Sequence, residues 1–164
     1  MNIAHVRIAR AALSAMLCLA LVAAFLPSRA FADDFRRGWV RILDYRERTL
    51  AELPVEIADT LELRLIGLSG RAGIGASRGM FFDFEEDQVM NMWMRDVHMP
   101  LDMIFMRRDG SVIRVARNAT PGSSRIHSSE EEGRYVLCIP AGLADKIGIK
   151  RGVRVIASSH RGGR

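Results

Sequence analysis

Short apolar runs separated by turn residues predict that most of the chain forms β-strands. From Leu53 to Ala58, apolar and polar residues alternate, which is typical of a half-buried strand. The same reasoning predicts further strands at Met80–Phe84, Val89–Met94, Leu101–Arg107, Ser111–Arg117, Arg134–Ile139 and Val153–Ala157.

The connections between these runs contain turn and helix signals. Asp109-Gly110 is a strong hairpin dipeptide because both residues tolerate positive φ. We interpret 85–88 as an acidic turn and 118–133 as a long polar connection. One short helix is expected after Ala58, with Asp59 as its cap and Glu62 completing a capping box, and a second at 141–147.

Many short strands and little helix predict a mainly β (α+β) domain. The expected architecture is an antiparallel β-sandwich or a partly closed β-barrel with one or two short helices, spanning residues 52–158. Residues 33–51 are dense in charge and are interpreted as a linker or as a loosely attached N-terminal segment, which would form a first strand. Residues 159–164 are interpreted as a disordered tail.

The N-terminal 32 residues resemble a secretory signal peptide. Arginines without acids precede an apolar run from Ala11 to Leu26, and the segment ends in Ala30-Phe31-Ala32. We therefore expect a periplasmic or secreted protein with no stable membrane span after cleavage. An uncleaved N-terminal anchor is the alternative.

Charge and cysteine content narrow the function classes once this segment is removed. Its three arginines and lack of acids lower the formal net charge from +5 to +2, and acids are interspersed among the remaining arginines. This removes the charge argument for nucleic-acid binding. Cys138 becomes the only cysteine, so no internal disulfide is expected and the domain depends on its core.

Several segments resemble the bacterial and archaeal family called domain of unknown function 192. Their order and spacing match over about 53–157, and they read VEIADT, GMFFDF, WMRD, MPLDMIF, RYVLCIPAG and GIKRGV. The most specific part is Trp93-Met94 with a basic residue, then Pro100-Leu101-Asp102 and an apolar tail. The resemblance implies a compact, mostly β, often exported domain with no established activity.

The chain also departs from this family's pattern. The family usually has Lys-Asn-Thr at the positions of Arg95-Asp96-Val97, and often glutamate at the position of Cys138. Of the family's Gly-Leu-Met-x-Arg motif, only Gly67, Leu68 and Arg71 are matched. A role assigned to the family's glutamate therefore does not transfer to this chain.

The segment 91–106 is the best candidate for a binding site because it places charges and an indole inside an apolar stretch. In a strand, Asp102 shares a face with Ile104 and Met106, so its carboxylate should be buried and need a partner. One interpretation pairs it with an arginine at the polar end of a pocket. The proposed ligand-binding residues are Trp93, Arg95, Asp96 and Asp102, with Arg71 or Arg78 of the glycine-rich loop 70–79 as a lid.

Two structural alternatives compete with this pocket. Asp102 would instead accept hydrogen bonds from backbone N–H groups near the Pro100 turn, and Trp93 would be a core residue. Trp93 alternates with Met92 and Met94, so on an extended strand it faces away from them.

Other chemistries are also considered. Thioethers are soft ligands that suit Cu(I), so one alternative function is Cu(I) binding by Met90, Met92, Met94 and His98. Methionine also fills irregular cores, which would explain these residues without a metal. A periplasmic hydrolase is the enzymatic alternative, without a nucleophile elbow or zinc spacing to support it. Cys138 lies between apolar neighbours and is expected to be an inert buried thiol.

The leading hypothesis is a non-catalytic module that binds a small molecule or glycan. It needs no cofactor or resident metal, and we expect a monomer.

Overall fold

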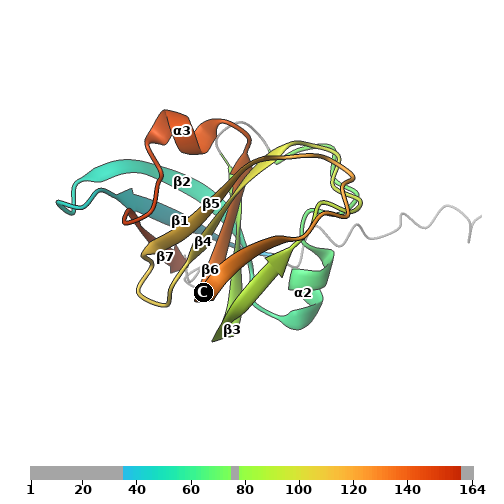
Figure 1. Ribbon diagram of the computed structural model, residues 1–164, viewed down its shortest axis with the longest axis horizontal. Helices are drawn as coiled ribbons and strands as arrows, with labels where there is room; N and C mark the ends of the chain where they lie inside the picture. The colour runs from blue at the N-terminus through green and yellow to red at the C-terminus, as the bar shows by residue number, and fades with distance from the viewer. Residues whose placement is uncertain (1–34, 75–77, 160–164) are drawn as a thin grey trace, which may run out of the picture. The chain divides into compact units, whose positions relative to one another are not determined.

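Seven strands form one curled sheet in the order β5-β4-β6-β3-β2-β1-β7 (Figure 1). The computed structural model describes residues 35–74 and 78–159, so the proposed signal peptide and residues 160–164 of the proposed tail lie outside the described residues. The elements are β1 (Arg36–Leu43), β2 (Thr49–Ala58), α2 (Leu61–Ile66), β3 (Gly79–Met92), β4 (Leu101–Met106), β5 (Val112–Ala119), β6 (His127–Pro140), α3 (Leu143–Ile147) and β7 (Arg154–Ser159). The mainly β prediction is confirmed.

The two edge strands of the sheet meet at one end. The N–H of Val112 donates to the carbonyl of Val153 at 2.8 Å, and the N–H of Val155 donates to the carbonyl of Gly110 at 2.9 Å. Gly110 has a φ of +81°, and a Cβ there would lie 2.3 Å from the Val155 carbonyl oxygen. The Asp109-Gly110 turn therefore closes the hairpin and also permits this contact. The result is a partly closed barrel, not two packed sheets.

One strand pair is parallel, which the sequence analysis did not anticipate. β2 pairs with the first residues of β3, in register from Val55 with Gly79 to Ala58 with Phe82. A parallel pair needs a crossover connection, and α2 lies within it. Its N-cap is Thr60, whose hydroxyl accepts a hydrogen bond from the N–H of Leu63. Asp59 is therefore not the cap, and the predicted capping box with Glu62 is wrong.

The segment 36–51 is not a linker. β1 pairs with β2 on one side and with β7 on the other, and Phe35 is buried just before it. Gly38, Val40 and Ile42 are buried while Arg37, Trp39 and Arg41 are exposed. The arginines mark the solvent face of a strand, so the domain begins well before residue 52.

β3 is a single strand through the stretch that was interpreted as an acidic turn. Its register with β6 shifts between Asp83 and Gln88, and Glu85 has a φ of +67°. β6 begins at His127, inside the expected long connection. The irregularity lets both strands continue past a bend, and Figure 1 shows this curl.

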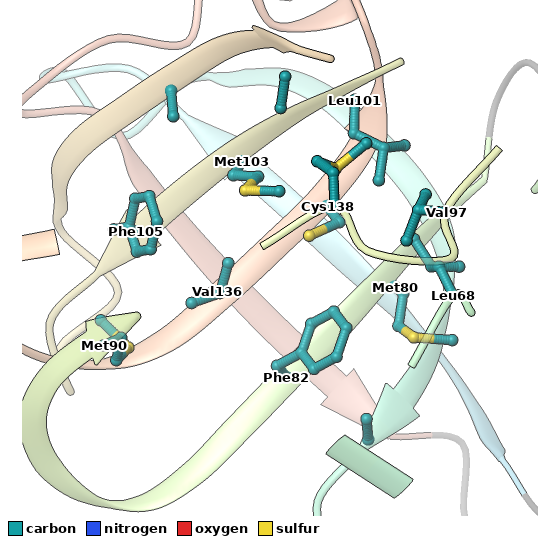
Figure 2. Close-up of a cluster of buried hydrophobic side chains, with 14 of the residues drawn as sticks. Leu68, Met80, Phe82, Met90, Val97, Leu101, Met103, Phe105, Val136 and Cys138 are labelled. Carbon is teal, nitrogen blue, oxygen red and sulfur yellow. The ribbon is translucent and has the colours of Figure 1, made fainter. Parts of the chain in front are cut away.

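Two hydrophobic clusters occupy the two faces of the central strands. On β4, Ile104 and Met106 belong to the cluster inside the barrel, whereas Leu101, Met103 and Phe105 belong to the cluster on the other face. Every residue of β4 is buried, as expected for a strand covered on both sides. Figure 2 shows the second cluster, to which β3, β4 and β6 all contribute and which Leu68 and Val97 cover at one end.

Among the described residues, no helix is long and apolar enough to cross a membrane.

Candidate functional site

A cavity of about 290 Å³ lies between α2, β3 and the turn that follows β3. Its volume is close to the lower end of the range for small-molecule pockets, roughly 300–1,000 Å³. The lining is mainly apolar and consists of Leu61, Arg64, Leu65, Ile66, Gly67, Leu68, Ser69, Phe82, Phe84, Gln88, Asn91, Met92, Trp93, Met94, Arg95, Val97, Leu101, Met103 and Cys138.

The floor of the pocket is part of the hydrophobic core. Phe82, Leu101, Met103 and Cys138 are buried and come from three adjacent strands, β3, β4 and β6 (Figure 2). Burial raises the pKa of the Cys138 thiol to about 12, so the thiolate is not populated at neutral pH. The floor is therefore apolar, and its thiol stays protonated at neutral pH, as expected for this cysteine from its neighbours.

The mouth of the pocket exposes three large hydrophobic side chains. Leu61 is 59% exposed, Leu65 is 67% exposed and Trp93 is 52% exposed, and all three are lining residues. Leu61 and Leu65 are four residues apart and therefore share one face of α2. Single exposed hydrophobics are common, but three at one opening mark a candidate binding surface.

Arg64 fixes α2 to the sheet. Its Nη1 donates to the carbonyls of Asp83 at 2.6 Å and Asp59 at 3.2 Å, and to Oε1 of Glu85 at 2.9 Å. Its guanidinium also lies 5.6 Å from the centre of the Phe84 ring. No residue of α2 is fully buried, so these contacts supply much of the attachment that core packing would otherwise give.

The turn that carries Arg95 is held by backbone hydrogen bonds on two sides. The N–H of Gly70 donates to the carbonyl of Asp96 at 2.8 Å, which joins the turn to the end of α2. The N–H of Met94 donates to the carbonyl of Ser123 at 3.1 Å, and the N–H of Gly122 donates to Val97 at 3.0 Å. Trp93 and Arg95 thus project from a backbone that is already in place.

The charge of the lining is positive. Arg64 and Arg95 are its only ionisable residues besides Cys138, and it contains no carboxylate. Glu85 balances Arg64. Among the described residues, no carboxylate forms an ion pair with the exposed Arg95.

The structure brings together two of the six residues proposed from the sequence. Trp93 and Arg95 line the pocket, but Trp93 lies just beyond the end of β3, and Met92 and Met94 line the same pocket, so the predicted alternation does not separate these side chains. Asp96 is exposed at a φ of +58° and does not line it. Arg71 forms an ion pair with Glu56 at 2.6 Å outside the lining. Arg78 is exposed and is also outside the lining.

Asp102 lies outside the pocket lining, and no arginine in the described part of the chain pairs with it. Its Oδ1 accepts a hydrogen bond from the N–H of Asn118 at 2.9 Å, and its Oδ2 accepts one from the N–H of Ala144 at 3.1 Å. Gly142, the N-cap of α3, has no side chain to satisfy that helix end, and Asp102 does so from β4. The pairing of Asp102 with an arginine at the pocket is therefore corrected, and backbone capping accounts for its burial.

The methionines of the copper alternative are mostly core residues. Met90 and Met94 are buried in the second cluster, and Met92 packs against it while His98 is exposed. Among the described residues, no group of three or more His, Cys, Asp or Glu side chains could hold a metal ion. Packing is sufficient to explain these thioethers.

The contribution of α2 to the pocket does not follow from the sequence pattern. Leu61, Arg64 and Leu65 form one side of the pocket, yet a six-residue helix gives too short a pattern to show which face is covered. The usable signal was the Leu61 and Leu65 pair at helical spacing, in a helix expected on the domain surface.

Comparison with known proteins identifies structural relatives. A protein from Sinorhizobium meliloti 1021, suggested to be a transcription regulator, shares 35% identity and a TM-score of 0.71, covering 75% of this chain and 95% of its own. A protein of unknown function from Novosphingobium aromaticivorans DSM 12444 shares 29% identity and a TM-score of 0.69, covering 81% and 94%. A comparison with curated proteins gives no match.

The family comparison agrees with the motifs. The model of DUF192, described as Uncharacterized ACR, matches residues 43–157. This match includes the strands and the turn that build the pocket. The chain belongs to the DUF192 family.

Proposed function

We propose that this protein is a non-catalytic module that binds a small, mainly apolar molecule in the pocket between α2 and β3. One observation carries the proposal: a buried apolar floor opens between three exposed hydrophobic side chains, Leu61, Leu65 and Trp93. A ligand seated there would remove these side chains from water, at roughly 25 cal/mol for each Å² of apolar surface covered.

The lining favours binding over hydrolysis. It contains no carboxylate or imidazole, and its thiol has a pKa of about 12. General acid–base catalysis needs a group that titrates near the working pH and lies within reach of the substrate. Binding requires only shape and apolar contact, which the lining supplies.

A sugar is the less favoured ligand. The exposed indole of Trp93 would stack on a sugar ring, which is the observation in favour of a glycan. The sugar hydroxyls, however, would face Phe82, Leu101 and Met103, which offer no hydrogen-bond partners. A ligand with an apolar body avoids this desolvation cost.

A matched pair of tryptophan variants tests the pocket. Trp39 and Trp93 are 51% and 52% exposed, but only Trp93 lines this cavity. N-phenyl-1-naphthylamine, an uncharged fluorescent probe, should bind the full-length protein, and Trp93→Ala should weaken binding about fivefold or more, because an aromatic contact contributes about 1 kcal/mol or more. Trp39→Ala should leave the affinity unchanged. Absence of probe binding, or equal losses in the two variants, would refute the proposal.

Export is proposed from residues 1–32 alone. A basic start, an apolar run and a small-residue end support it, and the binding module would then act outside the cytoplasm as a monomer. Cell fractionation followed by N-terminal sequencing tests this proposal. A cytoplasmic, uncleaved product would contradict it.

A further inference from the structure

We infer that the ligand carries one anionic group, which Arg95 holds at the rim while the apolar body enters the pocket. This inference rests on the proposed function and names the class of ligand, an amphipathic organic acid. Three observations carry it. The lining is positively charged, no acid among the residues 35–74 and 78–159 neutralises Arg95, and this exposed arginine lies at the edge of a pocket with an apolar floor.

The two cations of the lining differ in how far their donors are already used within the protein. Arg64 and Arg95 are the two arginines of the lining. Arg64 already donates to Glu85 and to two backbone carbonyls, so its donors are largely used within the protein. Among the described residues, no acid pairs with Arg95 and none lines the pocket. An incoming anion would therefore meet, in Arg95, a guanidinium without an ion-pair partner among the described residues, and the lining itself contains no carboxylate.

Arg95 and Trp93 lie close together at the rim of the pocket. Arg95 is exposed on a turn, two residues after Trp93, and Met94 between them is buried beneath the pocket. The turn is fixed by the Gly70 and Ser123 backbone hydrogen bonds, so the guanidinium and the indole stem from one preformed rim. A molecule that enters the apolar cavity from this side passes both groups. Its head group would remain at the solvent edge, where an ion is not desolvated.

The contact between Arg95 and the head group of the ligand would decide which ligand binds more tightly. Apolar contacts retain an acid and its uncharged analogue equally, so only the head-group contact distinguishes them. A charge-assisted hydrogen bond from a guanidinium is stronger than a neutral one. Because Arg95 is exposed, the preference for the acid should weaken as salt is added.

The experiment compares 2-naphthoate with the uncharged 2-naphthamide as competitors of N-phenyl-1-naphthylamine on the full-length protein. At low salt, the wild-type protein should bind the acid about five- to tenfold more tightly than the amide. Arg95→Gln should remove this preference without changing the affinity for the amide. Arg46→Gln, a change at an exposed arginine outside the lining, should keep it.

A second variant should act in the opposite direction. Glu85 is 60% exposed and balances Arg64, and it does not line the pocket. Glu85→Gln keeps the side-chain shape and the two backbone contacts of Arg64 but removes the negative charge, so the preference for the acid over the amide should rise about twofold. This gain cannot come from a loss of folding.

The outcomes distinguish failure of the anionic contact at Arg95 from failure of the apolar pocket. If acid and amide compete equally and Trp93→Ala weakens both, the anionic-ligand inference is wrong and the apolar pocket remains. A preference for the amide, or a preference for the acid that survives Arg95→Gln, also overturns the inference. If the fluorescent probe itself does not bind, the proposed function fails and the inference fails with it.

Discussion

Replacing Asp102 with alanine should destabilise the fold without altering the pocket. The carboxylate joins β4 to two other parts of the chain, since it accepts hydrogen bonds from Asn118 at the end of β5 and from Ala144 in the first turn of α3. The side chain is only 1% exposed, and Ala144 is fully buried. Water therefore cannot readily replace the lost acceptor.

The magnitude follows from the two backbone N–H groups left behind. A buried donor without an acceptor costs about 1–3 kcal/mol, so two donors give about 2–6 kcal/mol of lost unfolding free energy. Asp102→Asn retains one carbonyl acceptor but places an amide N–H against the second donor. We expect an intermediate loss for Asp102→Asn.

Urea denaturation followed by circular dichroism measures the effect. Asp87→Ala is the matched control, because Asp87 is 44% exposed and its ion pair with Arg108 at 3.4 Å should contribute less than about 1 kcal/mol. At temperatures where Asp102→Ala stays folded, its affinity for N-phenyl-1-naphthylamine should equal that of the wild type. A loss below about 1 kcal/mol for Asp102→Ala, or weaker probe binding by the folded variant, would refute the capping role.

Three further predictions concern single residues. Gly67 and Gly70 both have a positive φ, +47° and +71°, but a Cβ at Gly67 would lie 3.3 Å from the Phe82 ring whereas a Cβ at Gly70 would meet open space, so Gly67→Ala should lower the melting temperature more than Gly70→Ala. Equal shifts in melting temperature would show that the contact with Phe82 is irrelevant. Burial and two nearby arginines lower the pKa of His127 below its ordinary 6.5, so the free energy of unfolding should decrease as the pH falls below about 6.5. Urea titrations at a series of pH values should show a smaller decrease for His127→Gln, and an unchanged pH dependence would contradict the prediction. In a variant without the chain's other cysteine, Cys138 should react slowly with an aromatic disulfide reagent until urea unfolds the protein, because its pKa is about 12; rapid labelling of the native state would contradict this.

The sequence predicted a strand correctly where its apolar pattern and its burial depend on residues that are close together in the chain. The Asp109-Gly110 hairpin and the fully buried β4 follow from residues that are adjacent in the chain. β1 was expected only as a linker or a loosely attached strand, because its arginines obscured the alternation of Gly38, Val40 and Ile42. Its pairing with β2 and β7 depends on residues that are distant in the chain. The continuity of β3 was missed for the same reason. Its exposed middle is kept extended by β6, which follows much later in the sequence.

Strand parity explains which part of the candidate site was predictable. Trp93 and Arg95 were placed together because they are close in the chain, and the structure puts both in the lining. Asp102 was grouped with them for the same reason. Its neighbours Leu101 and Met103 line the pocket, so Asp102 must face the other side of the sheet. The sequence showed that alternation but could not show which face contained the cavity.

The pocket exists because the second face of the central strands is incompletely covered. The inner face is sealed by the curl of the sheet, whereas the outer face depends on α2, the turn at 94–97 and neighbouring loop residues. α2 has six residues and is about 9 Å long, and β3 has fourteen residues, which would span about 46 Å if straight. Such a short helix cannot close the gap, and the remaining apolar surface forms the floor beside Trp93. Coverage of this surface by a ligand would complete a core that the chain itself leaves open.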